Sequence, residues 1–256
     1  MRKLQDIALG CIPFLLIFVA WQMLSVYGGF PKKLVPELGQ IMSTFVRLAM
    51  EGILWKAAVS TLYRLLLGFI LSAVIGVVIG ILMGRHKLIE DALLPLISFV
   101  YPIPGIAYAP LFVLWFGLGD MPAILLIAFA STFAVIMNTW KGVKSVKPVW
   151  IKSAEIMGAK NVDIFWRIVL PGALPFILSG LRLGLASAWR ILVAVEMLMS
   201  VKVGLGWMIF GSQTFLNTDV MLATIALIGL IGVILEKQVF EQIERRTVVR
   251  WGMVRA

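Results

Sequence analysis

Long apolar stretches alternate with short charged segments along this chain of 256 residues. A helix needs about 20 apolar residues to cross a bilayer, so the pattern predicts six membrane-spanning helices in a single domain, 1–256. Their approximate ranges are 8–27, 58–84, 92–116, 121–140, 173–199 and 219–236. The predicted fold class is therefore an all-α membrane protein.

The composition supports a membrane protein. Hydrophobic residues make up 61% of the chain and charged residues 14%, whereas a soluble domain has about 25% charged residues. The formal net charge is +10, which in a soluble protein would suggest a nucleic-acid partner. In a membrane protein, basic loops facing an anionic leaflet explain the charge better, so we expect a lipid bilayer and no nucleic acid as partner.

The distribution of Lys and Arg predicts the orientation of the chain. With the N-terminus inside, the cytoplasmic segments contain fifteen Lys and Arg residues and the opposite side contains five. Basic loops are retained in the cytoplasm. We therefore expect a multi-pass membrane protein with both termini in the cytoplasm.

Small residues recur every fourth position in two of the predicted spans. The first stripe consists of Gly68, Ser72, Gly76, Gly80 and Gly84, and the second of Gly180, Gly184 and Ala188. On a helix such a stripe is a smooth surface that lets another backbone approach closely. We interpret both stripes as packing surfaces at the centre of a bundle.

Four prolines interrupt the third span: Pro95, Pro102, Pro104 and Pro110. Each removes a backbone donor and bends the helix, and free carbonyls at membrane depth are tolerated only next to protein or a water-filled cavity. Tyr101, Pro102 and Pro104 are therefore candidates for lining a pathway. A simple kink without a pathway explains the same residues equally well.

Ionisable residues inside predicted spans are candidates for function. Arg190 and Glu196 are about 9 Å apart along a helix but roughly 240° apart around it, so they should not pair with each other. Arg190 is a pathway candidate that would attract an anion, although a bond to another helix is the interpretation we favour. Glu196 could serve a gate or contact a binding protein, and Arg182 could extend towards the headgroups.

The segment 141–172 between the fourth and fifth spans is too polar for lipid and should be folded. Its pattern predicts one short helix over 149–157, a stop at Gly158, and a second helix over 160–169. Leu170-Pro171 should end the second helix before the next span. A helix-turn-helix on the inner face is suited to receive force from another protein.

The same segment resembles the cytoplasmic loop of permease subunits of type I ABC importers. It reads Lys152-Ser153-Ala154, three residues, Gly158, nine residues, then Ile168-Val169-Leu170-Pro171. The family has Glu-Ala-Ala where this chain has Lys-Ser-Ala. The residues that the resemblance assigns to ATPase coupling are Lys152, Ser153, Ala154, Glu155, Gly158, Ala159, Ile168, Leu170 and Pro171.

Further stretches are similar to the nitrate, sulfonate and taurine branch of these permeases. They include Ser60–Arg64, Trp115–Gly119, Gly142–Val146, Ser179–Arg182 and Glu196–Leu198. That branch often has Arg and Pro where this chain has Tyr101 and Gly105. The resemblance implies a MetI-like bundle of six helices with cytoplasmic coupling helices, located in the bacterial inner (plasma) membrane.

The resemblance also implies partners. A second permease copy, as in a homodimer, would complete the pathway, two ABC ATPase subunits would dock on the loops, and an extracytoplasmic binding protein would deliver solute. The chain has no Gly-x4-Gly-Lys-[Ser/Thr] motif, so ATP and Mg would be used by the partner ATPase. With one Cys and one His, we expect no metal, cofactor or catalytic residue in this chain.

The predicted function is import of a small anionic solute, such as a sulfonate, taurine, nitrate or an aromatic acid. A neutral vitamin or pyrimidine precursor is an alternative within the same fold. A membrane-embedded enzyme would need clustered ionisable residues at one depth, and a passive channel would have no use for a structured inner loop.

Overall fold

The computed structural model describes residues 2–199 and 201–236, which are helical and contain no strand. Two compact units make up the chain. Of the described residues, the first unit comprises 2–59 and 203–230, and the second comprises 60–199, 201–202 and 231–236. The absence of strands and the apolar helices confirm the predicted all-α class.

A helix covers most of each predicted span. The relevant elements are α1 (Arg2–Tyr27), α3 (Ile53–Arg85), α4 (Lys87–Val100), η1 (Gly105–Tyr108), α5 (Ala109–Phe116), α6 (Asp120–Ser145), α9 (Leu170–Leu198) and α11 (Thr218–Ile234). Among the described residues, three continuous helices have the length and composition to cross a membrane: Ile53–Arg85, Asp120–Ser145 and Asn161–Leu198. The α4 and η1–α5 pair, bent by 91°, would make a fourth, and Ile12–Tyr27 and Thr218–Ile234 are shorter apolar helices. The count of six spans stays a prediction.

In the first unit, hydrogen bonds join α1 to the segment that leads into α2 (Leu38–Met50). The Trp21 indole donates to the carbonyl of Pro36 (3.0 Å), and the Ser25 hydroxyl donates to the carbonyl of Val35 (2.8 Å). Gln22 Oε1 accepts from the Leu38 N–H at 3.0 Å and so satisfies a free donor at the start of α2. The first unit also contains α10 (Leu205–Thr214).

In the second unit, the first glycine stripe packs against α6. A Cβ added to Gly68, Gly76, Gly80 or Gly84 would lie 2.8, 2.6, 2.5 or 2.5 Å from a side-chain atom of Ile127, Val135, Thr139 or Val143, respectively. Each partner lies 59 positions further along the chain, so α3 and α6 run parallel in a constant register. The interpretation of this stripe as a packing surface is confirmed.

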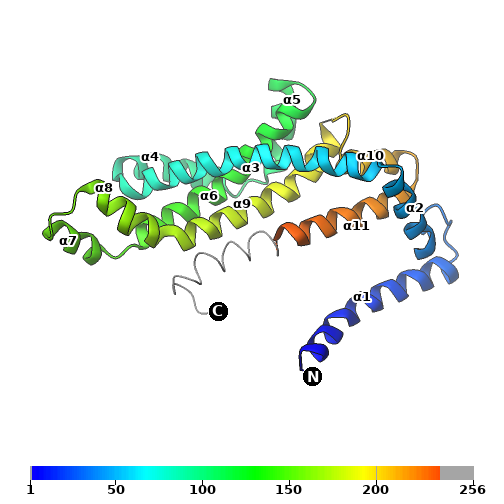
Figure 1. The fold of residues 1–256 in the computed structure, drawn as a ribbon. Helices are drawn as coiled ribbons and strands as arrows, with labels where there is room; N and C mark the ends of the chain where they lie inside the picture. The colour runs from blue at the N-terminus through cyan, green and yellow to red at the C-terminus, as the bar shows by residue number, and fades with distance from the viewer. Residues whose placement is uncertain (1, 200, 237–256) are drawn as a thin grey trace. The chain divides into compact units, whose positions relative to one another are not determined.

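The second stripe packs on another side of α6. A Cβ at Gly180 would lie 2.8 Å from Asn138 Cβ, and one at Gly184 would lie 2.7 Å from a Val135 methyl. Small residues on α3 and α9 thus hold α6 in the middle, and the three helices run side by side with α7 (Pro148–Ile156) and α8 (Asn161–Ile164) at one end (Figure 1). This core fixes the positions of the functional side chains.

The prediction that Leu170-Pro171 ends the second loop helix is wrong. A π-helical turn, η2 (Phe165–Val169), joins α8 to α9, and the Leu170 N–H donates to the Phe165 carbonyl. The wider turn relieves the clash that the Pro171 ring would otherwise make with a carbonyl of the preceding turn. The helix therefore continues from Asn161 to Leu198.

Candidate functional site

The elbow, defined as residues 148–169, folds as two short helices around a tight turn. Gly158 has φ of +81°, a left-handed conformation that glycine adopts without strain. Its N–H donates to the Glu155 carbonyl at 2.9 Å, and the Ala159 N–H donates to the Ala154 carbonyl at 3.0 Å. These bonds cap α7, so the predicted stop at Gly158 is confirmed.

The inner side of the elbow is anchored to the bundle. Part-buried side chains of α7, α8 and η2 pack against a cluster that includes Val143 of α6 and Ala173 and Ile177 of α9. The Arg85 guanidinium at the end of α3 lies 5.1 Å from the centre of the Phe165 ring, a cation–π contact. A displacement of the elbow would therefore be transmitted directly to α3, α6 and α9.

An ion pair between the buried Glu90 and the part-exposed Lys144 adds α4 to this anchored end. Glu90 of α4 is buried, and its carboxylate lies 2.5 Å from Lys144 Nζ of α6 and 3.8 Å from Lys87 Nζ. Paired charges of this kind fix relative positions more than they add stability. The four helix ends α3, α4, α6 and α9 are thus linked around the elbow.

The outer side of the elbow exposes large apolar side chains, which we call the elbow patch. Its members and their exposed fractions are Ile156 (87%), Met157 (85%), Val162 (67%), Trp166 (61%) and Trp150 (51%). Exposed apolar surface of this kind marks an interaction site. Motif reasoning missed these residues, although large apolar side chains in an otherwise polar loop were a readable signal.

The coupling residues predicted from the motif fall into two sets. Lys152, Ser153, Glu155 and Gly158 are exposed beside the elbow patch. The part-buried residues on the inner side are Ala154, Ala159, Ile168, Leu170 and Pro171. The first set is available to a partner, and the second set holds the elbow on the bundle.

The predicted pathway residues Tyr101, Pro102 and Pro104 lie at the break between α4 and η1. All three are exposed. A Cβ at Gly105 would lie 2.5 Å from Ala130 Cβ of α6 and 2.8 Å from Ile191 Cδ1 of α9. We call residues 101–105 the proline segment. It packs against α6 and α9 through Gly105, while its other side is exposed.

Arg190, the neighbour of Ile191, is exposed on α9. Within residues 2–199 and 201–236, its side chain forms no hydrogen bond or ion pair. The bond to another helix that we favoured for Arg190 is therefore not seen in the described part of the chain. The next residue, Ile191, is the one that lies against Gly105.

Glu196 lies in a different environment, a buried polar network that joins α3, α6 and α9. Arg64 Nη1 donates to Glu196 Oε1 at 2.6 Å, and Arg64 Nε donates to Asp120 Oδ1 at 2.8 Å. The Thr61 hydroxyl donates to Glu196 Oε2 at 3.0 Å. Glu196 is fully buried and Arg64 is 3% exposed, so the bond between them acts in a low-dielectric setting, whereas the Asp120 side chain is 56% exposed.

The sequence contained each of these polar residues but gave no signal that they pair. Thr61, Arg64, Asp120 and Glu196 come together only because of the registers between α3, α6 and α9. Arg182 lies near Glu236, with 3.6 Å between Nη2 and Oε1, in an exposed position.

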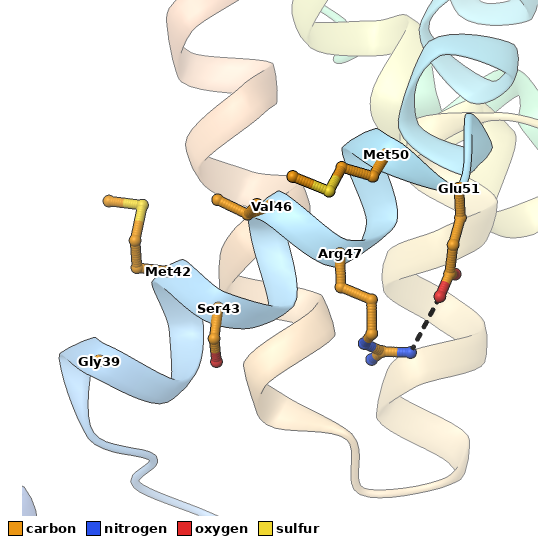
Figure 2. Close-up of a pocket in the computed structure, with 7 residues that line it drawn as sticks. All are labelled: Gly39, Met42, Ser43, Val46, Arg47, Met50 and Glu51. Atoms are coloured by element: carbon orange, nitrogen blue, oxygen red, sulfur yellow. Dashed lines mark ion pairs between the residues drawn. The ribbon is translucent and has the colours of Figure 1, made fainter.

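A shallow groove lies along one face of α2 in the first unit (Figure 2). It is lined by Gly39, Met42, Ser43, Val46, Arg47, Met50 and Glu51. The Thr44 hydroxyl, on the opposite side of α2, donates to Asp219 of α11 at 2.7 Å. The two faces of α2 therefore differ, one lining the groove and the other bonded to α11.

Comparison with known proteins identifies the family. Residues 76–248 match the family described as "Binding-protein-dependent transport system inner membrane component". The chain belongs to this family. Family members are permease subunits of ABC transporters in the inner membrane, and they work with ATPase and binding-protein partners.

Curated relatives cover most of the chain. The taurine transport system permease protein TauC of Escherichia coli is 36% identical over 91% of this chain and 86% of its own length. The putative aliphatic sulfonates transport permease protein SsuC of Bacillus subtilis is 34% identical over 92% and 84%. The bicarbonate transport system permease protein CmpB of Synechocystis is 29% identical over 73% and 66%.

A solved structure shows the same fold. A chain of the MetNI methionine ABC transporter in an inward-facing conformation superposes with a TM-score of 0.64 at 17% identity, covering 78% of this chain and 98% of that chain. The predicted MetI-like permease fold and the resemblance to the sulfonate and taurine branch are both confirmed.

Proposed function

We propose that two copies of this chain form the translocation pathway of an ABC importer for a small anionic solute. An ATPase subunit docks under the elbow of each copy and uses ATP and Mg, and an extracytoplasmic binding protein delivers the solute. The taurine, aliphatic sulfonate and bicarbonate named for the relatives share a compact anionic group, which supports this solute class.

The elbow patch is the observation that carries the proposal. Its side chains are more than half exposed in the single chain, while the same segment is anchored from behind by α6, α9 and Arg85. Binding of a partner to the elbow patch would be stabilised by burial of its apolar side chains. The bound partner could then move the elbow and the four helices linked to it. Nucleotide-driven closure of the two ATPases would then shift the bundle between its inward-open and outward-open states.

The proposal is tested by placing charge in the elbow patch. Full burial of one large apolar side chain contributes about 1.5–3 kcal/mol. The double substitution Ile156→Asp with Met157→Asp should therefore weaken the complex with the ATPase by about 100-fold or more. The measurement is co-purification of the cognate ATPase subunit with the detergent-solubilised permease.

Phe215→Asp is the matched control, because Phe215 is 75% exposed but lies between α10 and α11, far from the elbow in sequence. It should leave the ATPase complex intact. If the double variant retained the ATPase as fully as the Phe215 control, the assigned docking surface would be wrong.

A further inference from the structure

One face of α9 is left open by the residues that the structure describes. Its members are exposed or half-buried and recur at helical spacing: Phe176, Ser179, Leu183, Ala186, Ser187, Arg190 and Ala194. We call this the α9 open face. The opposite side of α9, which includes Gly184, Ala188 and Leu192, is buried.

Packed elements border the α9 open face on both edges. Ile191 and Trp189 lie about 100° to either side of Arg190 around the helix. Ile191 contacts the proline segment at Gly105, and Trp189 contacts α11, where a Cβ at Gly232 would lie 2.9 Å from its Nε1. The open face is therefore a strip bordered by the contact at Gly105 on one edge and the contact at Gly232 on the other, with Arg190 near its centre line.

The composition of the α9 open face differs from that of a lipid-facing helix surface. The exposed side of α3 in the same unit is formed by large side chains such as Leu66, Ile70, Val74 and Val78, as lipid requires. The α9 open face instead presents two serines, two alanines and one arginine beside Phe176 and Leu183. A charge at membrane depth faces protein or a water-filled cavity rather than lipid.

Arg190 also differs from Arg64 and Arg182 in its ion pairing. Arg64 is paired with Glu196 and Asp120, and Arg182 lies near Glu236. Arg190 has no counter-ion among the described residues. A guanidinium in a space of reduced dielectric attracts an anion strongly, and its planar donors match the oxygens of a carboxylate or sulfonate.

We infer that the α9 open face lines the water-filled pathway and that Arg190 is the group that binds the anionic head of the solute in transit. This inference rests on the proposed function, since the second copy would supply the facing wall and a second Arg190. The exposed position of Arg190 suits brief binding of the solute, because a transport site has to release what it binds.

The test uses single cysteines on the α9 open face in the assembled complex, in membrane vesicles. Cys11, the only cysteine of the chain, is first replaced by Ser. Ser187→Cys and Ala194→Cys each lie about one turn from Arg190. They are reacted with an anionic probe, 2-sulfonatoethyl methanethiosulfonate, and a cationic probe, 2-(trimethylammonio)ethyl methanethiosulfonate, with and without ATP.

Both cysteines should react, and the anionic probe should be preferred. Arg190→Gln should lower the ratio of anionic to cationic reaction rates by about tenfold, as expected for one unit charge about 6 Å away at the effective dielectric of a wet site. Arg190→Lys should retain most of the preference. Arg182→Gln, a matched loss of charge on the same helix, should leave the ratio unchanged, and Val78→Cys on the aliphatic side of α3 should not react.

Three outcomes would overturn the inference. The first is no reaction at either cysteine with or without ATP, as when lipid or the second copy covers the face. The others are reaction without charge preference and a preference that survives Arg190→Gln. Failure of the unsubstituted permease to co-purify with the ATPase, or retention of the ATPase by the Ile156→Asp and Met157→Asp double variant, would instead contradict the proposed function, so the two failures are distinguishable.

Discussion

Arg64 is the residue on which α3, α6 and α9 converge. Removing one partner of a buried ion pair leaves an uncompensated charge, which costs about 3–5 kcal/mol. We therefore expect Arg64→Met to lower the free energy of unfolding by about that amount, because Glu196 would remain fully buried without the guanidinium. Thermal or denaturant unfolding in detergent measures the change.

The control for this prediction is Arg47→Met, at an exposed pair with 3.7 Å between Arg47 Nη1 and Glu51 Oε1. Exposed pairs contribute about 0–1 kcal/mol, so this variant should unfold almost like the parent. Adding Glu196→Gln to Arg64→Met should recover part of the loss. Equal stability of the Arg64 and Arg47 variants would contradict the assigned network.

At the scale of elements, the parallel contact of α3 with α6 depends on missing side chains. Gly80→Ala would place a Cβ 2.5 Å from Thr139 Cβ and 2.9 Å from the Ile136 carbonyl oxygen. Such overpacking costs about 1–3 kcal/mol. We expect a lower unfolding temperature in detergent.

Gly229→Ala has the opposite expected sign and serves as the matched control. Gly229 lies within α11, and nothing lies within 4 Å of its ideal Cβ. Replacing a helical glycine by alanine stabilises by up to about 1 kcal/mol. If both alanine variants shifted stability in the same direction, the close approach of α3 to α6 would not be supported.

The elements differ in how far sequence could predict them. Periodic small residues revealed the packing stripes, and a single glycine revealed the turn of the elbow, because both signals are local. The π-helical turn at η2 was missed because Leu170-Pro171 reads as a stop unless the preceding turn widens. The registers that bring Arg64 to Glu196 depend on contacts across more than 130 positions, which no local pattern encodes.

At the scale of the whole molecule, two distinct surfaces have proposed roles in transport. We propose that the elbow patch, which is linked to the helix ends, docks the ATPase. The α9 open face carries a charge, Arg190, that no described residue neutralises. The motif predicted the location of the first surface but not its apolar side chains. For the second, Arg190 was visible in the sequence, and only the packing of Ile191 and Trp189 showed that its face is open.

The central claim is that the elbow contacts the ATPase. Met157→Cys, in the Cys11→Ser background and labelled with benzophenone-4-maleimide, tests it by photo-crosslinking in membranes that contain the assembled transporter. We expect a crosslink from position 157 of the Met157→Cys variant to the ATPase subunit, and none from position 215 of the Phe215→Cys variant. A crosslink from position 215 but not from position 157 would contradict the central claim.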